Sequence, residues 1–236
     1  MSQPKLLYAF VRFGVMAGVE HKAILNRPLM SVIDIGANRG QFALAVRAIS
    51  GARVISFEPL PQAAKLFKKV FINDSEVKLH EAAIGDKSGR KIIHLSARDD
   101  SSSLLEIGDA QCDLFPGTHE VGTLDVRVGA LDEFLRGDEI VKPAMLKLDV
   151  QGFELQALEG CKSLISNFDY VYCECSFVEL YKNQKLAREV VDYLSHLDFG
   201  LMGVYNPMYD RDGNCIQADL MFSHEVGACL KSGCEF

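Results

Sequence analysis

The chain has 236 residues, of which 48% are hydrophobic and 24% are charged, and its formal net charge is −7. These values favour a single α/β domain with an ample core, and they argue against a nucleic-acid partner, whose phosphates require a basic face. The seven cysteines form no C-x-x-C pair, which predicts reduced thiols in a cytoplasmic setting and neither a disulfide framework nor a zinc site.

Near its start the chain has an apolar run that is interrupted by Arg12 and by glycines. The run is shorter than the roughly 20 residues that cross a bilayer, and a charge at its centre is not typical of a signal peptide. Two alternatives remain: a helix that packs on the domain, or an interfacial helix whose Lys5, Arg12 and Lys22 face lipid headgroups. We therefore expect a helical N-terminal extension, residues 1–29, and peripheral membrane contact through residues 5–22 stays open.

From residue 31 onward, short apolar runs alternate with segments of helical periodicity. Strands are predicted at 31–35, 53–59 and 77–86, and helices at 41–50 and 61–71. This β-α-β-α-β order predicts a parallel sheet with right-handed crossovers.

The middle of the chain breaks this alternation. Strands are predicted at 89–97 and 122–130, and the polar segment between them, residues 97–121, has no strong periodicity. A segment of this kind is either a lid or substrate loop, or a flexible surface excursion.

The α/β alternation then returns and ends in a hairpin. The predicted elements are strands at 143–152 and 168–176, helices at 153–166 and 186–198, and two strands at 200–206 and 215–224 around an Asp-Gly turn.

The most informative stretch is the glycine loop, Gly36–Gly40, which follows the first predicted strand and precedes a helix. Sheets of this type bind ligands at such a position, and glycine lets the backbone approach a ligand closely. The spacing G-x-N-x-G is not the G-x-G-x-x-G of pyrophosphate-binding loops. Asp34, just before the loop, would repel a phosphate but suits an ammonium or a sulfonium.

A second acid completes the pattern. Glu58 follows the second predicted strand, where a carboxylate can accept hydrogen bonds from both hydroxyls of a ribose. The predicted ligand therefore carries a ribose and a positive charge and lacks a phosphate, and S-adenosylmethionine meets all three conditions.

With these motifs the sequence resembles the FkbM family of S-adenosylmethionine-dependent methyltransferases. The resemblance covers about residues 30–223 and rests on VIDIGANRGQFAL, SFEP, AAIGD, the SSS run, LKLDVQGFELQALEG, CECSFVELY and QADLMF. The first motif alone would indicate only a class I methyltransferase, and the KLDVQGFE run is the more specific part.

The resemblance implies a fold and an activity. The fold would be a class I methyltransferase, Rossmann-like doubly wound sheet of seven mostly parallel strands with an antiparallel last strand, over residues 30–236, plus the N-terminal helix. Family members are taken to methylate hydroxyl oxygens, so the implied acceptor is a hydroxyl on a sugar, a glycan or glycolipid, or another natural product. The alternatives are N-methylation of a small molecule and a non-catalytic assembly module, and no motif indicates an oligomeric state.

The resemblance also implies roles for the residues that would bind the cofactor. The loop that holds the methionine end would be formed by Asp34, Gly36, Asn38 and Gly40. The groups around the nucleoside would be Glu58 at the ribose, Pro59 in the turn after it, and Ala83 and Ile84 along the adenine. Each also has a purely structural alternative, such as a helix cap for Asp34 or plain core for Ala83 and Ile84.

Methyl transfer to an aliphatic hydroxyl needs a base, a metal ion or strong orientation. The candidate acids are Asp149, Glu174 and Glu154, of which the first two follow or lie near strand ends. Burial could raise the pKa of one of them into the range of a base, and Asp149 and Glu174 together could instead hold Mg²⁺, the less favoured alternative. Glu154 could also simply complement a helix dipole, and Lys147 is expected to form a structural ion pair.

No histidine stands out from the sequence as a catalytic group. His80 and His94 lie on or near predicted strands and are expected to be structural, and Tyr172 and Tyr181 are interpreted as packing residues.

Overall fold

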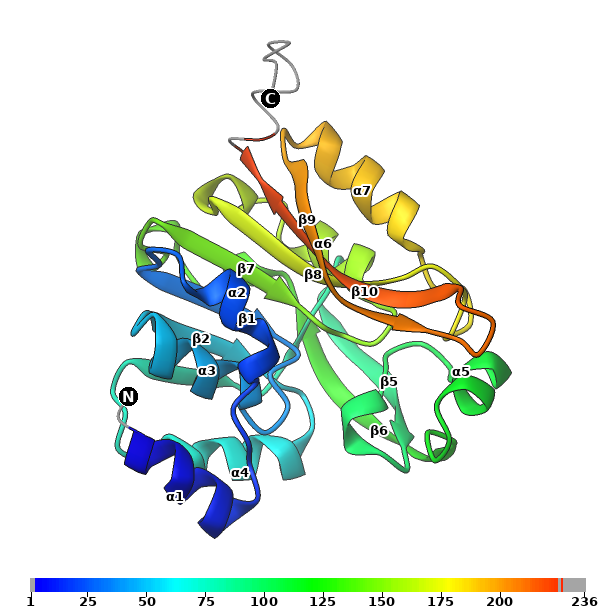
Figure 1. Cartoon of the computed structure of the whole chain (residues 1–236), viewed down its shortest axis with the longest axis horizontal. Helices are drawn as coiled ribbons and strands as arrows, with labels where there is room; N and C mark the ends of the chain where they lie inside the picture. Colours follow the sequence, from blue (N-terminus) through cyan, green and yellow to red (C-terminus); the bar gives the residue numbers. More distant parts are fainter. Residues whose placement is uncertain (1–2, 225, 227–236) are drawn as a thin grey trace.

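The computed structural model describes residues 3–224 and Val226. Within this part of the chain, the main sheet has seven strands in the order β3-β2-β1-β7-β8-β10-β9 (Figure 1). Their bounds are β1 Ser31–Ile35, β2 Arg53–Phe57, β3 Val77–His80, β7 Ala144–Leu148, β8 Tyr170–Ser176, β9 Gly200–Tyr209 and β10 Cys215–Ser223.

The strands of this sheet are parallel except for β10, which runs antiparallel to both of its neighbours, β8 and β9. Every residue of β1 and of β7 is buried, because helices cover both faces of the sheet. The predicted parallel core, the antiparallel last strand and the terminal hairpin are therefore confirmed.

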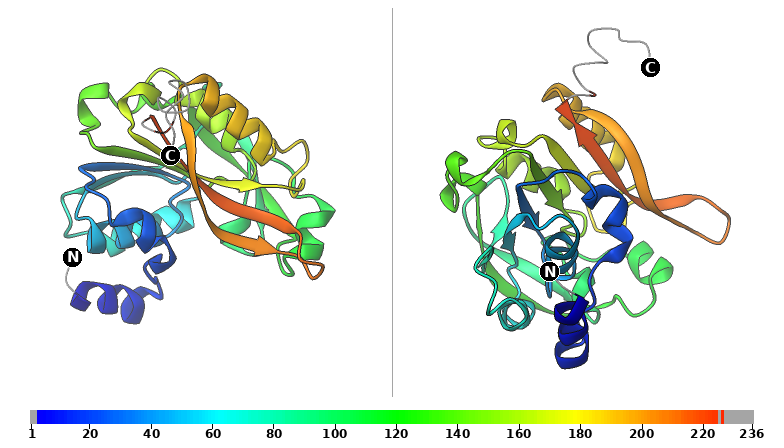
Figure 2. Two further views of the ribbon diagram at one scale, coloured as in Figure 1. Left: turned by 45° about the horizontal axis from the view of Figure 1, so that its top comes forward. Right: turned by 60° about the vertical axis from the view of Figure 1, so that its left-hand side comes forward.

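Helices lie in two layers, one on each face of the sheet (Figure 2). One layer holds α1 Gln3–Phe13, α2 Lys22–Leu25, α3 Gln41–Ile49 and α4 Pro61–Val70, and the other holds α6 Glu154–Gly160 and α7 Ala187–His196. Short 3₁₀ turns are η1 Val19–His21, η2 Asp99–Ser101, η3 Leu131–Glu133, η4 Gly137–Glu139 and η5 Ile165–Asn167. The two apolar cores pack on opposite faces of the sheet and hold its strands in place. The carboxyl ends of the parallel strands therefore lie together along one edge of the sheet.

The predicted strand over 77–86 is wrong as a single element. The chain leaves the main sheet after His80, and β4 (Ala83–Ile84) joins a second sheet of order β4-β6-β5. In this small sheet β6 (Glu120–Gly129) pairs parallel with β4 and antiparallel with β5 (Gly89–Ser96). Segment 97–121, between β5 and β6, contains η2 and α5 (Asp109–Leu114), so it is largely ordered by its own short helices.

The N-terminal extension contains α1, η1 and α2. The helix predicted over 153–166 is shorter in the structure, because it ends at Gly160, a weak helix former. There the amide of Cys161 bonds to the carbonyls of Ala157 and Leu158, which tightens the last turn. None of the helices among the described residues has the length and apolar character needed to cross a membrane.

Candidate active site

A cavity of about 240 Å³ lies where the carboxyl ends of β1, β2 and β7 meet the second sheet. Most of the residues predicted to form the site line it, namely Gly36, Asn38, Glu58, Pro59, Ala83, Ile84 and Asp149. The others lie behind the wall, namely Asp34, Gly40, Glu154 and Glu174. Four chain segments that are distant in sequence thus converge on one pocket.

The glycine loop owes its glycines to packing inside the protein. Gly36 has φ +80°, and a Cβ there would overlap the carbonyl oxygen of Asp149. Gly40 has φ +93°, and a Cβ there would collide with the ring of Phe71. That these glycines also let the backbone approach a ligand stays a prediction. In the structure, Gly36 permits the close approach of the end of β7, and Gly40 permits packing against the end of α4.

Glu58 is held rigidly at the cavity wall. Its two carboxylate oxygens accept hydrogen bonds from the backbone N–H groups of Asn38, at 2.8 Å, and of Leu60, at 2.7 Å. The side chain is almost fully buried, and this burial raises the pKa of Glu58 to about 7, although the two backbone donors oppose the shift. Each oxygen retains a lone pair, so the carboxylate can accept further hydrogen bonds from a pair of hydroxyls.

Two amide side chains on the cavity wall have acceptor atoms without partners. The side-chain oxygens of Asn38 and Gln41 are buried and accept no hydrogen bond from the described residues. Buried polar atoms in proteins are nearly always satisfied. These two oxygens therefore fit a ligand that brings its own donors, such as the ammonium of an amino-acid group.

Beneath the loop lies a buried ion pair, as expected for Lys147. Its ammonium lies 3.1 Å from Asp34 Oδ1 and 3.5 Å from Asp149 Oδ2, and it donates a hydrogen bond of 3.0 Å to the carbonyl of Gly36. Burial alone would lower the pKa of Lys147, but the two carboxylates outweigh it and raise the pKa. Asp34 is completely buried, so any effect it has on a ligand passes through Lys147 and the loop.

Gln151 joins two of the candidate acids. Its side-chain amide nitrogen donates to Asp149 Oδ1 and to Glu174 Oε2, both at 2.8 Å. Its amide oxygen accepts a hydrogen bond of 2.9 Å from Tyr181, which is therefore more than a packing residue. Sequence reasoning missed Gln151, although it lies inside the KLDVQGFE run.

The protonation states of the two acids differ. Burial opposes ionisation of Asp149, but the Lys147 ammonium and the Gln151 amide hold the pKa of Asp149 below its usual range. Burial and then the Asp149 charge raise the pKa of Glu174 well above its usual range. Asp149 is therefore the ionised member of the pair, and Glu174 is the protonated one.

Glu154 stabilises the turn after β7 and does not line the cavity. One of its oxygens accepts hydrogen bonds of 3.1 Å from the backbone N–H groups of Val150 and Gly152. Burial raises the pKa of Glu154 to about 7, opposed by backbone donors. This carboxyl group closes the turn that presents Asp149 and Gln151 at the cavity.

Among residues 3–224, no group of three or more His, Cys, Asp or Glu side chains gathers so as to hold an ion. Between Asp149 and Glu174 stands the amide nitrogen of Gln151, which is a hydrogen-bond donor and not a metal ligand.

Further lining residues come from the N-terminal extension and from segment 97–121. Ser102 and Ser103, of the SSS run, reach the cavity from segment 97–121, and Glu20 and His21 reach it from the N-terminal extension. The sequence did not single out Glu20 or His21, because their place depends on contacts between distant parts of the chain.

Comparison with known proteins agrees with this geometry. The family model described as the methyltransferase FkbM domain matches residues 34–201. The 2-O-methyltransferase NoeI of Sinorhizobium fredii (strain NBRC 101917 / NGR234) is 27% identical over 179 residues, which cover 73% of this chain and 74% of NoeI. The hexuronic acid methyltransferase AglP of Haloferax volcanii is 27% identical over 180 residues, which cover 70% of this chain and 67% of AglP.

A solved structure is similar in fold. Sp1610 of Streptococcus pneumoniae, determined in complex with S-adenosyl-L-methionine, aligns with a TM-score of 0.50 at 7% identity over 94% of this chain and 73% of its own. At such low identity the likeness concerns the fold alone. The likeness agrees with the class I fold, and the match over residues 34–201 shows that this chain belongs to the FkbM family of S-adenosylmethionine-dependent methyltransferases.

Proposed function

We propose that the protein transfers the methyl group of S-adenosylmethionine to a hydroxyl oxygen of a sugar, either in a glycan or in a glycolipid. The names of NoeI and AglP, which refer to a 2-O-position and to hexuronic acid, support a sugar acceptor. The observation that carries the proposal is the single cavity that brings Glu58, the two unpaired amide oxygens and ionised Asp149 together.

The cavity suggests a place for each part of the cofactor. Glu58 would accept hydrogen bonds from the ribose hydroxyls, and Ala83 and Ile84 would pack against the adenine. The amide oxygen of Asn38 and the loop at Gly36 would receive the ammonium of the methionine end. Asp34 would support this loop from beneath through Lys147, without touching the cofactor.

Of the three candidate catalytic acids, Asp149 alone lines the cavity, so we assign it a place beside the reacting atoms. S-adenosylmethionine supplies a methyl group that is activated by a positive sulfur. An ionised carboxylate beside that centre would attract the sulfonium and would orient the acceptor hydroxyl by accepting its hydrogen bond. Glu174 and Glu154 would hold Asp149 and its loop in place.

The N-terminal extension supports a second part of the proposal, contact with an anionic membrane surface. Leu7, Tyr8, Phe10 and Val11 on α1 are between 52% and 75% exposed, although Ala9 of the same helix packs into the core. An apolar face on the outside of a helix is unfavourable in water and typical of helices that lie in a membrane interface.

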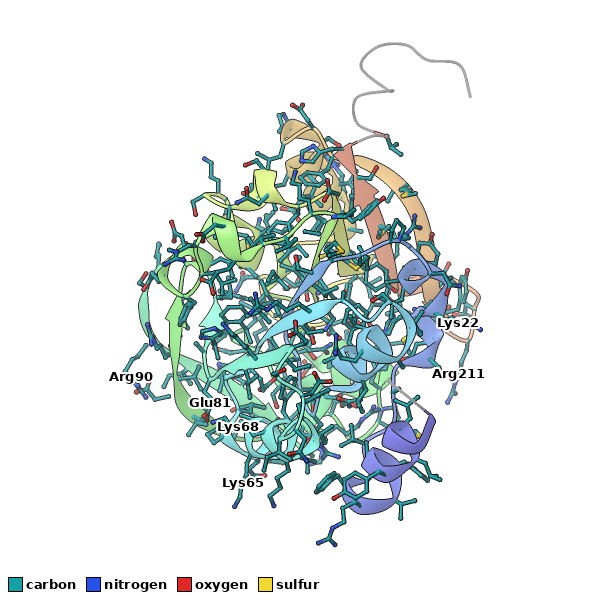
Figure 3. The ribbon with its side chains drawn as sticks, turned by 90° about the vertical axis from the view of Figure 1, so that its left-hand side faces the viewer. Lys22, Lys65, Lys68, Glu81, Arg90 and Arg211 are labelled. Carbon is teal, nitrogen blue, oxygen red and sulfur yellow. The ribbon has the colours of Figure 1, made fainter. Side chains whose placement is uncertain are left out.

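The charges around α1 agree with that partner. Helix α4 packs beside α1, and Figure 3 shows Lys65 and Lys68 projecting from α4 at the lower edge of the molecule, where α1 also lies. Residues 6–30 and 61–72 together carry six lysines and arginines against one acid, Glu20, and of the six Lys68 pairs with Glu81, in a chain whose net charge is −7. This asymmetry favours anionic lipid headgroups. Arg12 and Lys22 are exposed, as an interfacial role needs, and the side chain of Lys5 lies outside the described residues.

The proposed reaction predicts a defined product. Incubation with methyl-labelled S-adenosylmethionine and a panel of sugars, including hexuronic acids and glycolipids, should place one labelled methyl group on a hydroxyl oxygen. Mass spectrometry and NMR of the product identify the methylated atom. Label on nitrogen, or no transfer to any sugar by protein that binds the cofactor, would contradict the proposal.

The assignment of Glu58 to the ribose predicts that its removal weakens cofactor binding and that the wild-type affinity depends on pH. Glu58→Ala should weaken binding of S-adenosylmethionine at least about tenfold, because the ribose hydroxyls lose their acceptor. With a pKa of about 7, the wild-type affinity should rise about tenfold from pH 6 to pH 8, and the variant should lose this rise. Calorimetric titration measures both effects, and Glu76→Ala, an exposed acid away from the cavity, is the matched control.

The assignment of Asp149 predicts a catalytic defect without unfolding. Asp149→Asn preserves the shape of the side chain but removes its charge, so kcat should fall on the order of a hundredfold. The melting temperature should stay close to that of Asp212→Asn, which changes an exposed loop acid. Wild-type turnover in Asp149→Asn would remove this residue from the mechanism.

If α1 contacts lipid, the protein should bind vesicles made of phosphatidylglycerol and phosphatidylcholine. This binding should weaken as salt is added, and vesicles of phosphatidylcholine alone should not bind the protein. The double variant Leu7→Asp, Val11→Asp should lower vesicle binding at least about tenfold, whereas Val121→Asp, at an exposed apolar position of β6, should not. Sedimentation with vesicles measures this. If the double variant binds vesicles as well as the wild type, the assignment of α1 to lipid contact is overturned. It is also overturned if light scattering shows that the wild type is a dimer and the double variant a monomer.

A further inference from the structure

His21 lies on the cavity wall although sequence reasoning did not select it. It ends η1, in the N-terminal extension, and so lies outside the matched family region of residues 34–201. Its ring contacts the rings of Phe42 and Tyr172, with centroids 5.0 and 5.6 Å apart. Packing of this kind fixes the orientation of the imidazole.

A chain of hydrogen bonds leads from His21 away from the cavity. Nδ1 of His21 lies 3.0 Å from the hydroxyl of Tyr172, which donates a hydrogen bond of 2.7 Å to Asp219 Oδ2. The amide nitrogen of Asn206 donates to both of these oxygens, at 3.2 and 2.7 Å. Four elements, η1, β8, β9 and β10, thus contribute one residue each to a polar network in which Tyr172 is buried and Asn206 lies at the surface.

This network selects one tautomer of His21. The single proton of the Tyr172 hydroxyl goes to the carboxylate of Asp219, so the hydroxyl oxygen can only accept from Nδ1. Nδ1 therefore carries the proton of the neutral ring, and Nε2 carries the lone pair. Nε2 lies 3.5 Å from Glu20 Oε1, and Glu20 lines the same cavity.

The groups that face His21 keep it neutral and ready to accept a proton. Burial lowers the pKa of His21, opposed first by Asp219 and more weakly by Glu20 and Asp149, while the Lys147 ammonium lowers it further. The imidazole is thus unprotonated at neutral pH. Once protonated, it would face the Asp219 carboxylate through Tyr172.

The carboxyl groups of the site are less suited than His21 to accept a proton near neutral pH. The pKa of Asp149 is held low by Lys147, and a strongly ionised carboxylate is a weak base. Glu174 is protonated and lies behind the cavity wall. Glu58 is already engaged by two backbone donors and is assigned to the ribose.

We infer that Nε2 of His21 is the general base of the reaction, and that Tyr172, Asp219 and Asn206 are its positioning residues. The inference rests on the proposed methylation of a hydroxyl. As the acceptor oxygen bonds to the methyl carbon, its proton passes to Nε2, and the carbon–sulfur bond breaks with its electron pair remaining on sulfur. The imidazolium then returns the proton to solvent.

The test uses substitutions that distinguish the function of Nδ1 of His21 from that of Nε2. Asparagine can reproduce the Nδ1 donor to Tyr172 but has no group at Nε2, so His21→Asn should lower kcat on the order of a hundredfold or more while the affinity for S-adenosylmethionine changes less than about twofold. At saturating S-adenosylmethionine, where the titration of Glu58 does not limit binding, the fall of wild-type kcat on the acid side should disappear in this variant. His196→Asn, on the exposed face of α7, is the matched control.

The positioning residues have a different signature. Tyr172→Phe keeps the ring but leaves Nδ1 without a partner, so kcat should fall about tenfold with KM unchanged. Long-range ¹H–¹⁵N NMR spectra of the full chain should show the Nδ1–H tautomer of His21 at pH 7.5 in the wild type, and a mixture of tautomers in Tyr172→Phe.

Two results would overturn the inference: wild-type kcat in His21→Asn, or an Nε2–H tautomer in the wild-type spectrum. The spectrum needs no acceptor, so it decides the role of His21 even where no sugar is methylated. Absence of sugar methylation with an Nδ1–H tautomer would count against the proposed acceptor and not against the base.

Discussion

The site depends on one buried charge, the ammonium of Lys147. It bridges β1 and β7 by pairing with Asp34 and Asp149, and it binds the carbonyl of Gly36 at the start of the glycine loop. Removing Lys147 would leave the fully buried Asp34 carboxylate unpaired, which costs about 3–5 kcal/mol. The ammonium therefore fixes the glycine loop relative to Asp149.

A row of polar groups extends this connection across the sheet. Ser56, Asp34, Lys147 and Tyr172 occupy neighbouring register positions on β2, β1, β7 and β8, and Asp219 of β10 accepts from Tyr172. Buried polar groups are tolerated when each one satisfies the next, and such networks favour a single arrangement. Polar contacts link Ser56, Asp34 and Lys147 on one side of this row, and Tyr172 and Asp219 on the other, so each part of the row holds the strands beside it in one arrangement.

The parts of the molecule that local patterns encode could be predicted from the sequence. The alternation of β1, α3, β2 and α4 follows from apolar periodicity, and the glycine loop with Glu58 indicates the nucleoside. What could not be predicted depends on pairing between distant residues. Lys147 neutralises Asp34, 113 positions away, and His21 meets Asp219, which is 198 positions away. Likewise, the division of 77–86 between two sheets is decided by the partner strand β6, not by the segment itself.

The position of β10 has a consequence for biosynthesis. Because β10 lies between β8 and β9, the edge of β8 stays unpaired until residues 215–223 have emerged from the ribosome. Asp219 arrives with that strand, so the glycine loop and Glu58 can be in place long before the Tyr172 network forms. Strand β10 thus completes the sheet late in synthesis, and a chain released before it would expose an unpaired strand edge.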